Sequence, residues 1–408
     1  MSSTSKICCE ICGEQTHAIR LHLNAGAHPD MTLEKYQSIY PNAEIMSEYA
    51  KGHVEKQKAA LKEKAEIERV NMATGSVVSI MSHLKPEKVA MNKVFDLKRS
   101  KAALSSSGNE IMIERAHRTG EYVDLIPEID DNYIYPIDLL KNVLMGLEEN
   151  IPTLLWGHAG VGKSTMYEQV CARTNRPYMR VQHTANTEES HIIGQILANK
   201  DGTYFEPGPL TLAMKHGFVY NADEYDFAHA SILGVYQPVL EGKPLIIKEA
   251  PVEWRVVKPH KNFRFVATGN TNGSGDETGL YAGTNIGNAA NYSRFGITDH
   301  VQYMPKKQEA AIIAAQGDID IEDAKLLVEF ATKIRNAFDS SQMSATIGPR
   351  ELIYAAKLGL RKGSWKRGVE LAFINRMGTV DMNVAAGIAQ RIFSETTAAV
   401  ALEEEFEY

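Results

Sequence analysis

A glycine-rich segment that ends in lysine and serine is the part of the sequence that most directly indicates chemistry. Residues 157–164 read GHAGVGKS and fit the spacing G-x-x-x-x-G-K-[ST]. Glycines at this spacing let backbone N–H groups turn toward phosphate oxygens, the lysine can reach the β- and γ-phosphates, and the serine hydroxyl can contact Mg²⁺. The sequence therefore predicts a site for ATP and Mg²⁺ on Gly157, His158, Ala159, Gly160, Val161, Gly162, Lys163, Ser164 and Thr165.

Two acidic residues that follow an apolar run are candidates for metal binding and proton transfer. Asp223 and Glu224 come directly after residues 218–222, which read FVYNA. The carboxyl end of a buried parallel strand would place both acids beside the phosphate-binding loop. We expect Asp223 to hold Mg²⁺ through water and Glu224 to act as general base on the attacking water. Asp226 lies near enough in sequence to assist them.

Three further residues could contact the γ-phosphate. Asn270 follows the apolar run at 263–268, where its amide could hydrogen-bond the phosphate and the attacking water together. The alternative is an asparagine that only forms a turn, which is common before such a sequence as T-N-G. Arg294 precedes the helical C-terminal part, and Arg350 begins a helix there, after Pro349. Spacing alone assigns no role to either arginine.

A second group of candidate metal ligands lies near the N-terminus and consists of Cys9, Cys12, His22 and His28. The two cysteines have the spacing C-x₂-C. Two thiolates and two imidazoles form a tetrahedral structural Zn²⁺ site, so the sequence predicts zinc here. His17 is an alternative to His28 as the fourth ligand, and Cys8 is an alternative to Cys9.

The segment that follows these ligands gives two interpretations of what this module contacts. Residues 31–41 read MTLEKYQSIYP and resemble the end of zinc fingers of the Ros/MucR type, which bind DNA. Lysine and arginine are sparse in the module, however, and contacts to DNA phosphates need several of them. Nucleic acid and protein therefore both remain candidate partners of this module.

The pattern of apolar residues predicts the elements that must position these groups. Short apolar runs separated by helical patterns indicate an α/β core with a parallel sheet. The expected strands are Thr153–Trp156, Tyr178–Val181, Phe218–Ala222 and Phe263–Thr268. The expected helices of a C-terminal lid are 306–338, 349–361 and 365–399. The predicted domains are a zinc-binding module at 1–50, a charged helical linker at 51–110, the α/β core at 111–304 and the helical lid at 305–408.

Composition excludes several classes of protein. The chain has 408 residues, 44% hydrophobic residues and a net charge of −7, so no global basic field attracts it to nucleic acid. No apolar stretch is long enough to span a bilayer, so we expect no membrane partner. Four cysteines, three of them close together, favour metal binding over a disulfide framework. We therefore expect a cytoplasmic protein.

Several longer motifs resemble the AAA+ ATPases of the MoxR group, and within it the CobS-type ATPase subunit of cobaltochelatase. The resemblance covers about residues 120–400, and its motifs are more specific than the phosphate-binding loop alone. The motifs are DEYD at 223–226, RPYMRV at 176–181, VKPHKNFRFVATGNT at 257–271 and GDETGLYAGT at 275–284.

The resemblance implies a fold, a reaction and roles for the two arginines. The fold would be an AAA+ P-loop α/β domain with a helical lid. Subunits would form a ring, expected to be a hexamer, that hydrolyses ATP at each interface. Arg294 would act on the ATP of the neighbouring subunit, and Arg350 would be the arginine with which the lid senses the nucleotide. Insertions at 183–217 and 243–257 would face the pore or the client protein.

The resemblance also suggests a partner and two alternatives. The expected partner is a protein with a von Willebrand A-type domain, which the ring would remodel. One alternative is a nucleic-acid motor with a DNA-binding zinc finger. The other is a cobaltochelatase subunit. In place of the acid that the cobaltochelatase pattern has near Ser190–Gly194, this chain has Ser190-His191-Ile192, and nothing marks a tetrapyrrole site. Cobalt insertion is therefore not carried over.

Overall fold

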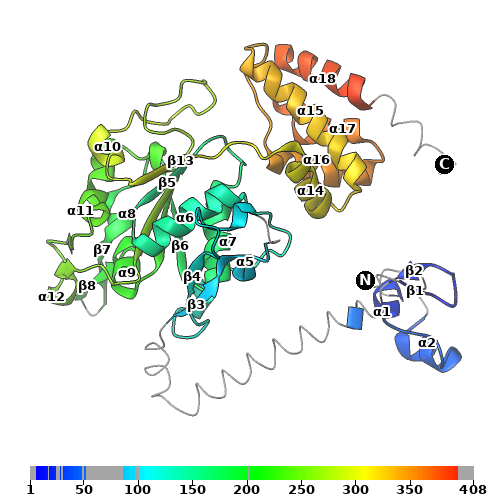
Figure 1. The fold of residues 1–408 in the computed structure, drawn as a ribbon, viewed down its shortest axis with the longest axis horizontal. Coiled ribbons are helices and arrows are strands. Elements are labelled where there is room, and N and C mark those ends of the chain that lie inside the picture. Colours follow the sequence, from blue (N-terminus) through cyan, green and yellow to red (C-terminus); the bar gives the residue numbers. More distant parts are fainter. Residues whose placement is uncertain are drawn as a thin grey trace. The chain divides into compact units, whose positions relative to one another are not determined.

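The computed structural model describes residues 6–16, 18–23, 28, 31–47, 50–51, 86–97, 101–200 and 202–393. The chain divides into two compact units, Met1–Leu84 and Lys85–Tyr408 (Figure 1). Within the described ranges, no helix is both long and apolar enough to cross a membrane.

A five-stranded, wholly parallel sheet forms the centre of the larger unit. The strand order is β13 (Ile297–His300), β5 (Thr153–Trp156), β12 (Arg264–Gly269), β9 (Val219–Asp223) and β6 (Tyr178–Gln182). The predicted α/β fold is confirmed, and the four predicted strands are present within one residue at each end. The fifth strand, β13, was not predicted. Its sequence, ITDH, has a single apolar residue because it lies at an edge of the sheet, where burial is partial.

Helices cover both faces of the sheet, because successive strand side chains point to opposite sides. One buried cluster, under α9 (Pro209–His216), contains Leu154, Tyr220 and Phe265. The opposite cluster, under α6 (Ile137–Glu149) and α7 (Lys163–Thr174), contains Leu155, Val219 and Val266. Both faces are therefore buried, and only the strand ends are available for a site.

Part of the predicted linker belongs to this core. Strand β3 (Glu87–Ala90) pairs with β4 (Met112–Arg115) in an antiparallel hairpin, and α5 (Met91–Val94) follows β3. Met91 and Phe95 are buried in the cluster under α6 and α7. Their spacing of four residues is helical, but the polar run SKAALSSSGNE that follows favours a linker in the sequence. The core thus begins before the predicted boundary at Ile111, while residues 52–85 and 98–100 of the predicted linker lie outside the described residues.

Both insertions expected from the resemblance form hairpins. Strands β7 (Gly194–Asn199) and β8 (Gly202–Pro207) pair with each other, as do β10 (Leu245–Ile246) and β11 (Val256–Val257). Short helices complete the unit: α8 (Glu189–Ile193), α10 (Ala230–Leu233), α11 (Gln237–Leu240), α12 (Val252–Arg255) and α13 (Ala289–Tyr292). The 3₁₀ turns are η2 (Lys101–Ala103), η3 (Val123–Leu125), η4 (Tyr225–Phe227), η5 (Gly234–Tyr236) and η6 (Ile374–Arg376).

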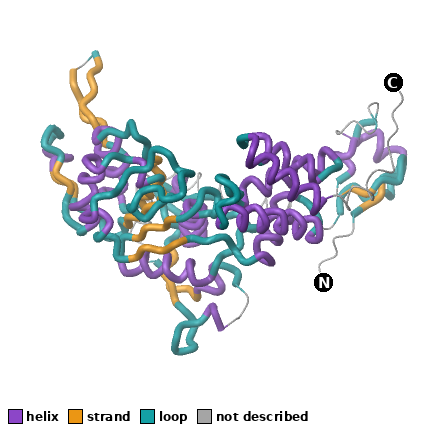
Figure 2. Tube along the Cα trace, turned by 90° about the horizontal axis from the view of Figure 1, so that it is seen from above, coloured by secondary structure: helices purple, strands orange, loops and turns teal. Residues whose placement is uncertain are grey.

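The C-terminal lid consists of helices around its own apolar core (Figure 2). They are α14 (Lys306–Gly317), α15 (Ile321–Asp339), α16 (Pro349–Lys362), α17 (Trp365–Ala372) and α18 (Thr379–Phe393). The stretch predicted as helical at 306–338 forms two helices, α14 and α15, because the chain turns at Asp318, whose φ is 57°. The helix predicted at 365–399 is likewise broken, with η6 between α17 and α18, and residues beyond 393 lie outside the described part.

The smaller unit is built around the cysteine pair. Strands β1 (Ile7–Cys8) and β2 (Gln15–Thr16) flank a tight turn, and α1 (Ile19–His22) and α2 (Leu33–Ile39) follow. Its described apolar cluster holds only five buried residues, Ile7, Cys9, Ile19, Leu23 and Tyr36. So small a core gives little stability by itself.

A buried ion pair holds the lid together. Glu309, which is 1% exposed, accepts two hydrogen bonds of 2.8 and 2.6 Å from the Arg335 guanidinium. The same guanidinium donates to the backbone carbonyl of Ile347 at 3.0 Å and lies 3.7 Å from the ring centre of Tyr303. This pair therefore links α14, α15 and the segment before α16.

We expect Glu309→Ala to destabilise the lid by about 3–5 kcal/mol, because it leaves the Arg335 charge buried without its partner. Glu322→Ala is the matched control: Glu322 pairs with Lys325 at the surface of the same lid, and its loss should cost less than about 1 kcal/mol. Native-state hydrogen exchange of the α15 amides measures both free energies. Equal effects of the two substitutions would contradict the assignment.

Candidate functional site

The phosphate-binding loop joins the end of β5 to the start of α7. Gly157, Gly160 and Gly162 have φ of 145°, 81° and 93°, values that favour glycine. A Cβ atom on Gly157 would lie 2.3 Å from the carbonyl oxygen of Val301, so no side chain fits there. The predicted loop residues therefore adopt a curved backbone that needs these glycines.

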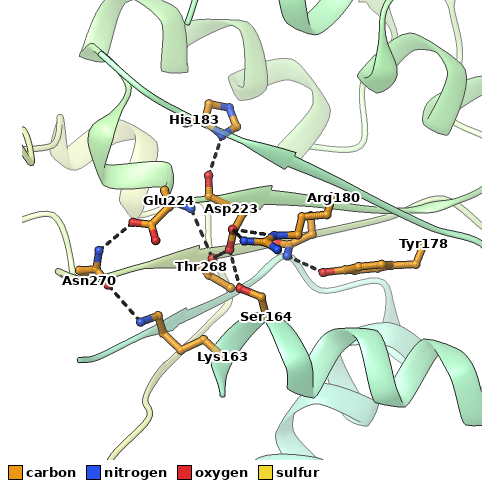
Figure 3. A network of polar contacts seen from close by, with 10 residues as sticks. Lys163, Ser164, Tyr178, Arg180, His183, Asp223, Glu224, Thr268 and Asn270 are labelled. Carbon is orange, nitrogen blue, oxygen red and sulfur yellow. Dashed lines mark hydrogen bonds and ion pairs between the residues drawn. The ribbon is translucent and has the colours of Figure 1, made fainter. Parts of the chain in front are cut away.

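Asp223 ends β9 and receives hydrogen bonds from three neighbouring elements (Figure 3). The Ser164 hydroxyl donates to its Oδ1 at 2.6 Å, and the Thr268 hydroxyl donates to the same oxygen. From β6, Arg180 donates to Oδ2, with its Nε at 2.7 Å. Asp223 is 1% exposed. The predicted pair of Mg²⁺-binding groups, Ser164 and Asp223, is thus brought together.

The Asn270 side chain connects the phosphate-loop lysine to the proposed base (Figure 3). Its Oδ1 accepts from Lys163 Nζ at 3.1 Å, and its Nδ2 donates to Glu224 Oε2 at 2.7 Å. Lys163 also donates to the backbone carbonyls of Gly157 at 2.6 Å and His158 at 2.9 Å. Hydrogen bonds therefore link the Lys163 ammonium, the Asn270 amide and the Glu224 carboxylate beside the loop.

Asp226 holds the turn that presents Asn270. Its Oδ2 accepts from the backbone N–H groups of Asn270 at 2.9 Å and Thr271 at 2.8 Å, and from the Thr271 hydroxyl at 3.0 Å. It therefore positions Asn270. The sequence predicted only that Asp226 would assist the two preceding acids.

Burial and neighbouring charges separate the proton affinities of these groups. Burial lowers the pKa of Lys163 to about 8, although three nearby carboxylates partly oppose this shift. Burial also raises the pKa of Glu224, and repulsion from Asp223 adds to that rise. Burial alone would raise the pKa of Asp223, but hydrogen bonds from Ser164, Thr268 and Arg180 hold it below its usual value. Asp223 is thus the group kept ionised.

A cavity of about 210 Å³ adjoins the loop and contains Arg350 in its wall. Its lining includes Tyr133, Gly160, Gly162 and Thr165 from the core and Arg350 and Ile353 from α16. A Cβ atom on Gly160 would lie 3.6 Å from that of Arg350. Among the described residues, no hydrogen bond or ion pair is recorded for the Arg350 guanidinium. The second predicted arginine therefore lies beside the phosphate loop of its own chain.

Arg294 lies elsewhere. Its Nε and an NH group donate to Glu241 Oε1 at 2.8 and 2.7 Å, and it also contacts the backbone carbonyl of Ala290. Within one chain, then, the structure does not bring Arg294 to the residues around Lys163.

Two site residues were missed by sequence reasoning. Arg180 neutralises Asp223 across the sheet. His183, 1% exposed, contacts the backbone carbonyl of Asp223 through Nδ1 at 3.0 Å and the Tyr236 hydroxyl through Nε2 at 2.7 Å. The available signal was a charged and a polar side chain at the carboxyl end of a predicted strand, in RPYMRVQH.

The donor set fits a nucleotide with Mg²⁺. Two oxygen donors, the Ser164 hydroxyl and the Asp223 carboxylate, lie 2.6 Å apart, and hard oxygen ligands are those that Mg²⁺ prefers. Lys163 and the N-terminus of α7 supply the positive charge that phosphate needs.

The predicted zinc ligands also lie together in the smaller unit. The ligand atoms of Cys9, Cys12, His22 and His28 are all within 4.8 Å of one another. The Sγ–Nε2 distances are 3.2 Å for Cys12 and His22 and 3.8 Å for Cys9 and His28. A tetrahedral zinc site with two sulfur and two nitrogen ligands has ligand separations of about 3.3–3.8 Å. The two cysteine–histidine pairs lie close to this range, and two thiolates with two imidazoles are a donor set that suits Zn²⁺.

The alternative zinc ligands are less favoured by the structure or fall outside it. The Cys8 thiol is exposed, contacts the Gly13 carbonyl at 3.2 Å and is not among the four clustered ligand groups. His17 lies outside the described residues.

Comparison with known proteins identifies the family. The AAA domain of the dynein-related subfamily matches residues 152–284, and the CbbQ/NirQ/NorQ C-terminal domain matches residues 309–394. The aerobic cobaltochelatase subunit CobS of Sinorhizobium sp is 32% identical over 279 residues, which cover 66% of this chain and 83% of that protein.

Other relatives extend over the same region. Protein CbbQ of Hydrogenophilus thermoluteolus is 27% identical over 208 residues, covering 51% of this chain and 74% of its own. Protein NorQ of Paracoccus denitrificans (strain Pd 1222) is 26% identical over 239 residues, which cover 59% of this chain and 84% of that protein. Among solved structures, the Thermotoga maritima RuvB Holliday junction branch migration motor matches with a TM-score of 0.38 and 14% identity over 66% of this chain and 73% of that chain, too distant to support an argument.

The two matched domains, the CobS relationship and the convergence of the loop, the two acids and the asparagine agree with one another. The chain belongs to the MoxR group of AAA+ ATPases and is an ATPase of that group.

Proposed function

We propose that this ATPase works as a ring, with six subunits as the expected number, and that hydrolysis at the subunit interfaces remodels a partner protein. The observation that supports it most directly is the position of Arg294. Every other predicted catalytic residue gathers beside the phosphate loop of one chain, whereas Arg294 is paired with Glu241. For Arg294 to act on ATP, it would have to reach the site of a second subunit.

The proposed roles follow from the contacts in the site. Lys163 binds the outer phosphates, and Ser164 and Asp223 hold Mg²⁺, which when bound would offset phosphate charge. Glu224 accepts the proton of the attacking water, and its raised pKa suits a group that must take up a proton. Asn270 orients the water and contacts the γ-phosphate. Arg350 brings the lid onto the nucleotide.

The nature of the partner is proposed from the family resemblance. The CobS relative is described as a subunit of a cobaltochelatase, which is said of that protein. For this chain we propose a partner with a von Willebrand A-type domain. The hairpins β7–β8 and β10–β11 are the proposed contact elements, and they expose Ile196, Tyr204, Ile246 and Val256.

A zinc-bound N-terminal module would give the motor a second contact site. Its four ligands lie together, and cysteines clustered as metal ligands are typical of a reducing compartment, so we propose that the protein is cytoplasmic. A nucleic-acid partner of this module is the second candidate, favoured by the zinc-finger-like sequence at 31–41.

Glu224→Gln should bind ATP and hydrolyse it about 10²–10⁴-fold more slowly, because the amide cannot accept the proton. Phosphate release measures turnover, and equilibrium dialysis measures binding. Glu149→Gln, an exposed acid at the end of α6, is the control and should leave both unchanged. Turnover of Glu224→Gln equal to that of the unmodified chain would show that another group activates the water.

Arg294→Ala should lower turnover by about 10³–10⁵-fold if this arginine completes the neighbouring site. Mixing Arg294→Ala with Glu224→Gln subunits should restore activity, because some interfaces then combine an intact Glu224 with an intact Arg294. Assembly is checked by light scattering. Mixed rings that stay inactive would contradict action between subunits, and a chain that stays monomeric with ATP would contradict the ring.

One Zn²⁺ per chain is expected in protein purified without added metal, measured by elemental analysis. Cys12→Ser should lose this metal and unfold the N-terminal unit, because metal binding provides about 10–16 kcal/mol in small zinc modules. Cys8→Ser is the matched control, since the Cys8 thiol lies outside the cluster, and it should retain the metal. Equal zinc content in the two variants would refute the ligand set.

A further inference from the structure

The loop that follows β12 reaches back to the phosphate-binding loop through a single tyrosine. The Tyr281 hydroxyl accepts a hydrogen bond from the backbone N–H of Ala159 at 3.0 Å. The same hydroxyl lies 3.0 Å from His158 Nδ1. Burial raises the pKa of Tyr281 to about 12, so its oxygen stays protonated and carries one donor besides its acceptor sites.

The contact occupies the part of the loop that would meet the outer phosphates. Lys163 donates to the carbonyls of Gly157 and His158, so this end of the loop is the end where the lysine head lies. A phosphate-loop lysine reaches the β- and γ-phosphates, and the loop N–H groups face phosphate oxygens. The hydroxyl oxygen of Tyr281 thus takes the place of an acceptor on the N–H of Ala159.

The segment that carries Tyr281 is anchored at its two ends, whereas its tip has mainly internal bonds. The backbone N–H of Asn285 donates to the backbone carbonyl of Asp226 at 2.8 Å, and that of Gly287 donates to the Gly273 carbonyl at 2.8 Å. Within the tip, Asp276 accepts from the backbone N–H groups of Thr278 and Tyr281 and from the Thr278 hydroxyl, which shapes the turn that presents Tyr281. Among the described residues, the recorded hydrogen bonds that join the tip to the phosphate loop are those of Tyr281.

We propose that Tyr281 is a latch that senses the terminal phosphate: it closes on the Ala159 N–H when no γ-phosphate is present, and ATP displaces it whereas ADP does not. A nucleotide that needs this N–H must break the Tyr281 bond, and only the triphosphate extends to that end of the loop. The tip at 276–284 is then released in the ATP state and held in the ADP and nucleotide-free states.

The latch would also carry the nucleotide state to the lid. The His158 ring, bonded to Tyr281, stacks on Tyr303 at 5.7 Å between ring centres and meets Phe338 of α15 edge-on at 6.0 Å. Tyr303 precedes α14 and contacts Arg335 of the buried lid pair. Release of Tyr281 therefore removes a hydrogen bond from His158, whose ring packs against Tyr303 and against Phe338 of the lid.

Tyr281→Phe tests the proposal, because it keeps the ring and removes only the hydroxyl. It should bind the non-hydrolysable analogue adenosine 5′-(β,γ-imido)triphosphate roughly 2- to 10-fold more tightly, the range expected for one hydrogen bond no longer broken, while ADP affinity stays the same. Tyr292→Phe is the matched control. The Tyr292 ring packs against Gly273 and Gly287 at the base of the same segment, and its hydroxyl has no hydrogen-bond partner among the described residues.

Hydrogen exchange supplies a readout independent of affinity and turnover. In the unmodified chain, the amides of 276–284 should exchange faster with the triphosphate analogue than with ADP, and in Tyr281→Phe they should exchange fast in every state. The proposal is overturned if the analogue and ADP protect the tip equally, or if Tyr281→Phe keeps the affinity ratio of Tyr292→Phe. Failure of the unmodified chain to bind either nucleotide would instead overturn the phosphate site itself.

Discussion

A buried carboxylate at the end of a central strand is the constraint on which the site depends. Asp223 is 1% exposed and ionised, so each of its oxygens must be satisfied by neighbouring groups. The donors come from α7, β12 and β6, through Ser164, Thr268 and Arg180. Thr268 and Arg180 can reach Asp223 only because β12 and β6 are the strands on either side of β9. The chemistry of the site therefore requires this strand order.

The sequence predicted those parts of the site whose residues are contiguous or directly follow an apolar run. The phosphate-binding loop is contiguous, and the acids directly follow an apolar run, so their placement needed only the assumption of a parallel sheet. Arg180 could not be assigned in this way. It pairs in register with Asn221, two residues before Asp223, and thus shares a sheet face with that acid. The neighbour and register of a strand depend on the folded sheet, and a single sequence gives neither.

The missed features have similar physical reasons. The strand β13 has only one apolar residue because an edge strand is buried on fewer sides, so the alternation that reveals a strand is weak. The break between α14 and α15 lies at Asp318, where a left-handed residue ends one helix within a run whose apolar spacing continues into the next. Tyr281 is joined to Ala159 across 122 residues, a contact between loops that leaves no periodic signal.

The state of Arg294 bears on how a site shared between subunits could work. Its pair with Glu241 is partly exposed, at 26% and 32% of the two side chains, and exposed ion pairs contribute little to stability. A neighbouring phosphate in a site that excludes water would attract the guanidinium more strongly than this carboxylate does. Pairing within one chain therefore holds the Arg294 side chain at low cost, and it leaves the residue available for a second subunit.

The N-terminal unit differs from the ATPase unit in how its fold is stabilised. Its cluster of five buried residues includes Cys9, one of the proposed ligands, and the Tyr36 hydroxyl accepts from the backbone N–H of Glu10 within the cysteine turn at 2.9 Å. Core and ligand set thus share Cys9, so the metal and the fold would be gained or lost together. The larger unit has separate cores on both faces of its sheet and in its lid. Loss of the proposed zinc should consequently unfold the N-terminal unit while the ATPase unit remains folded.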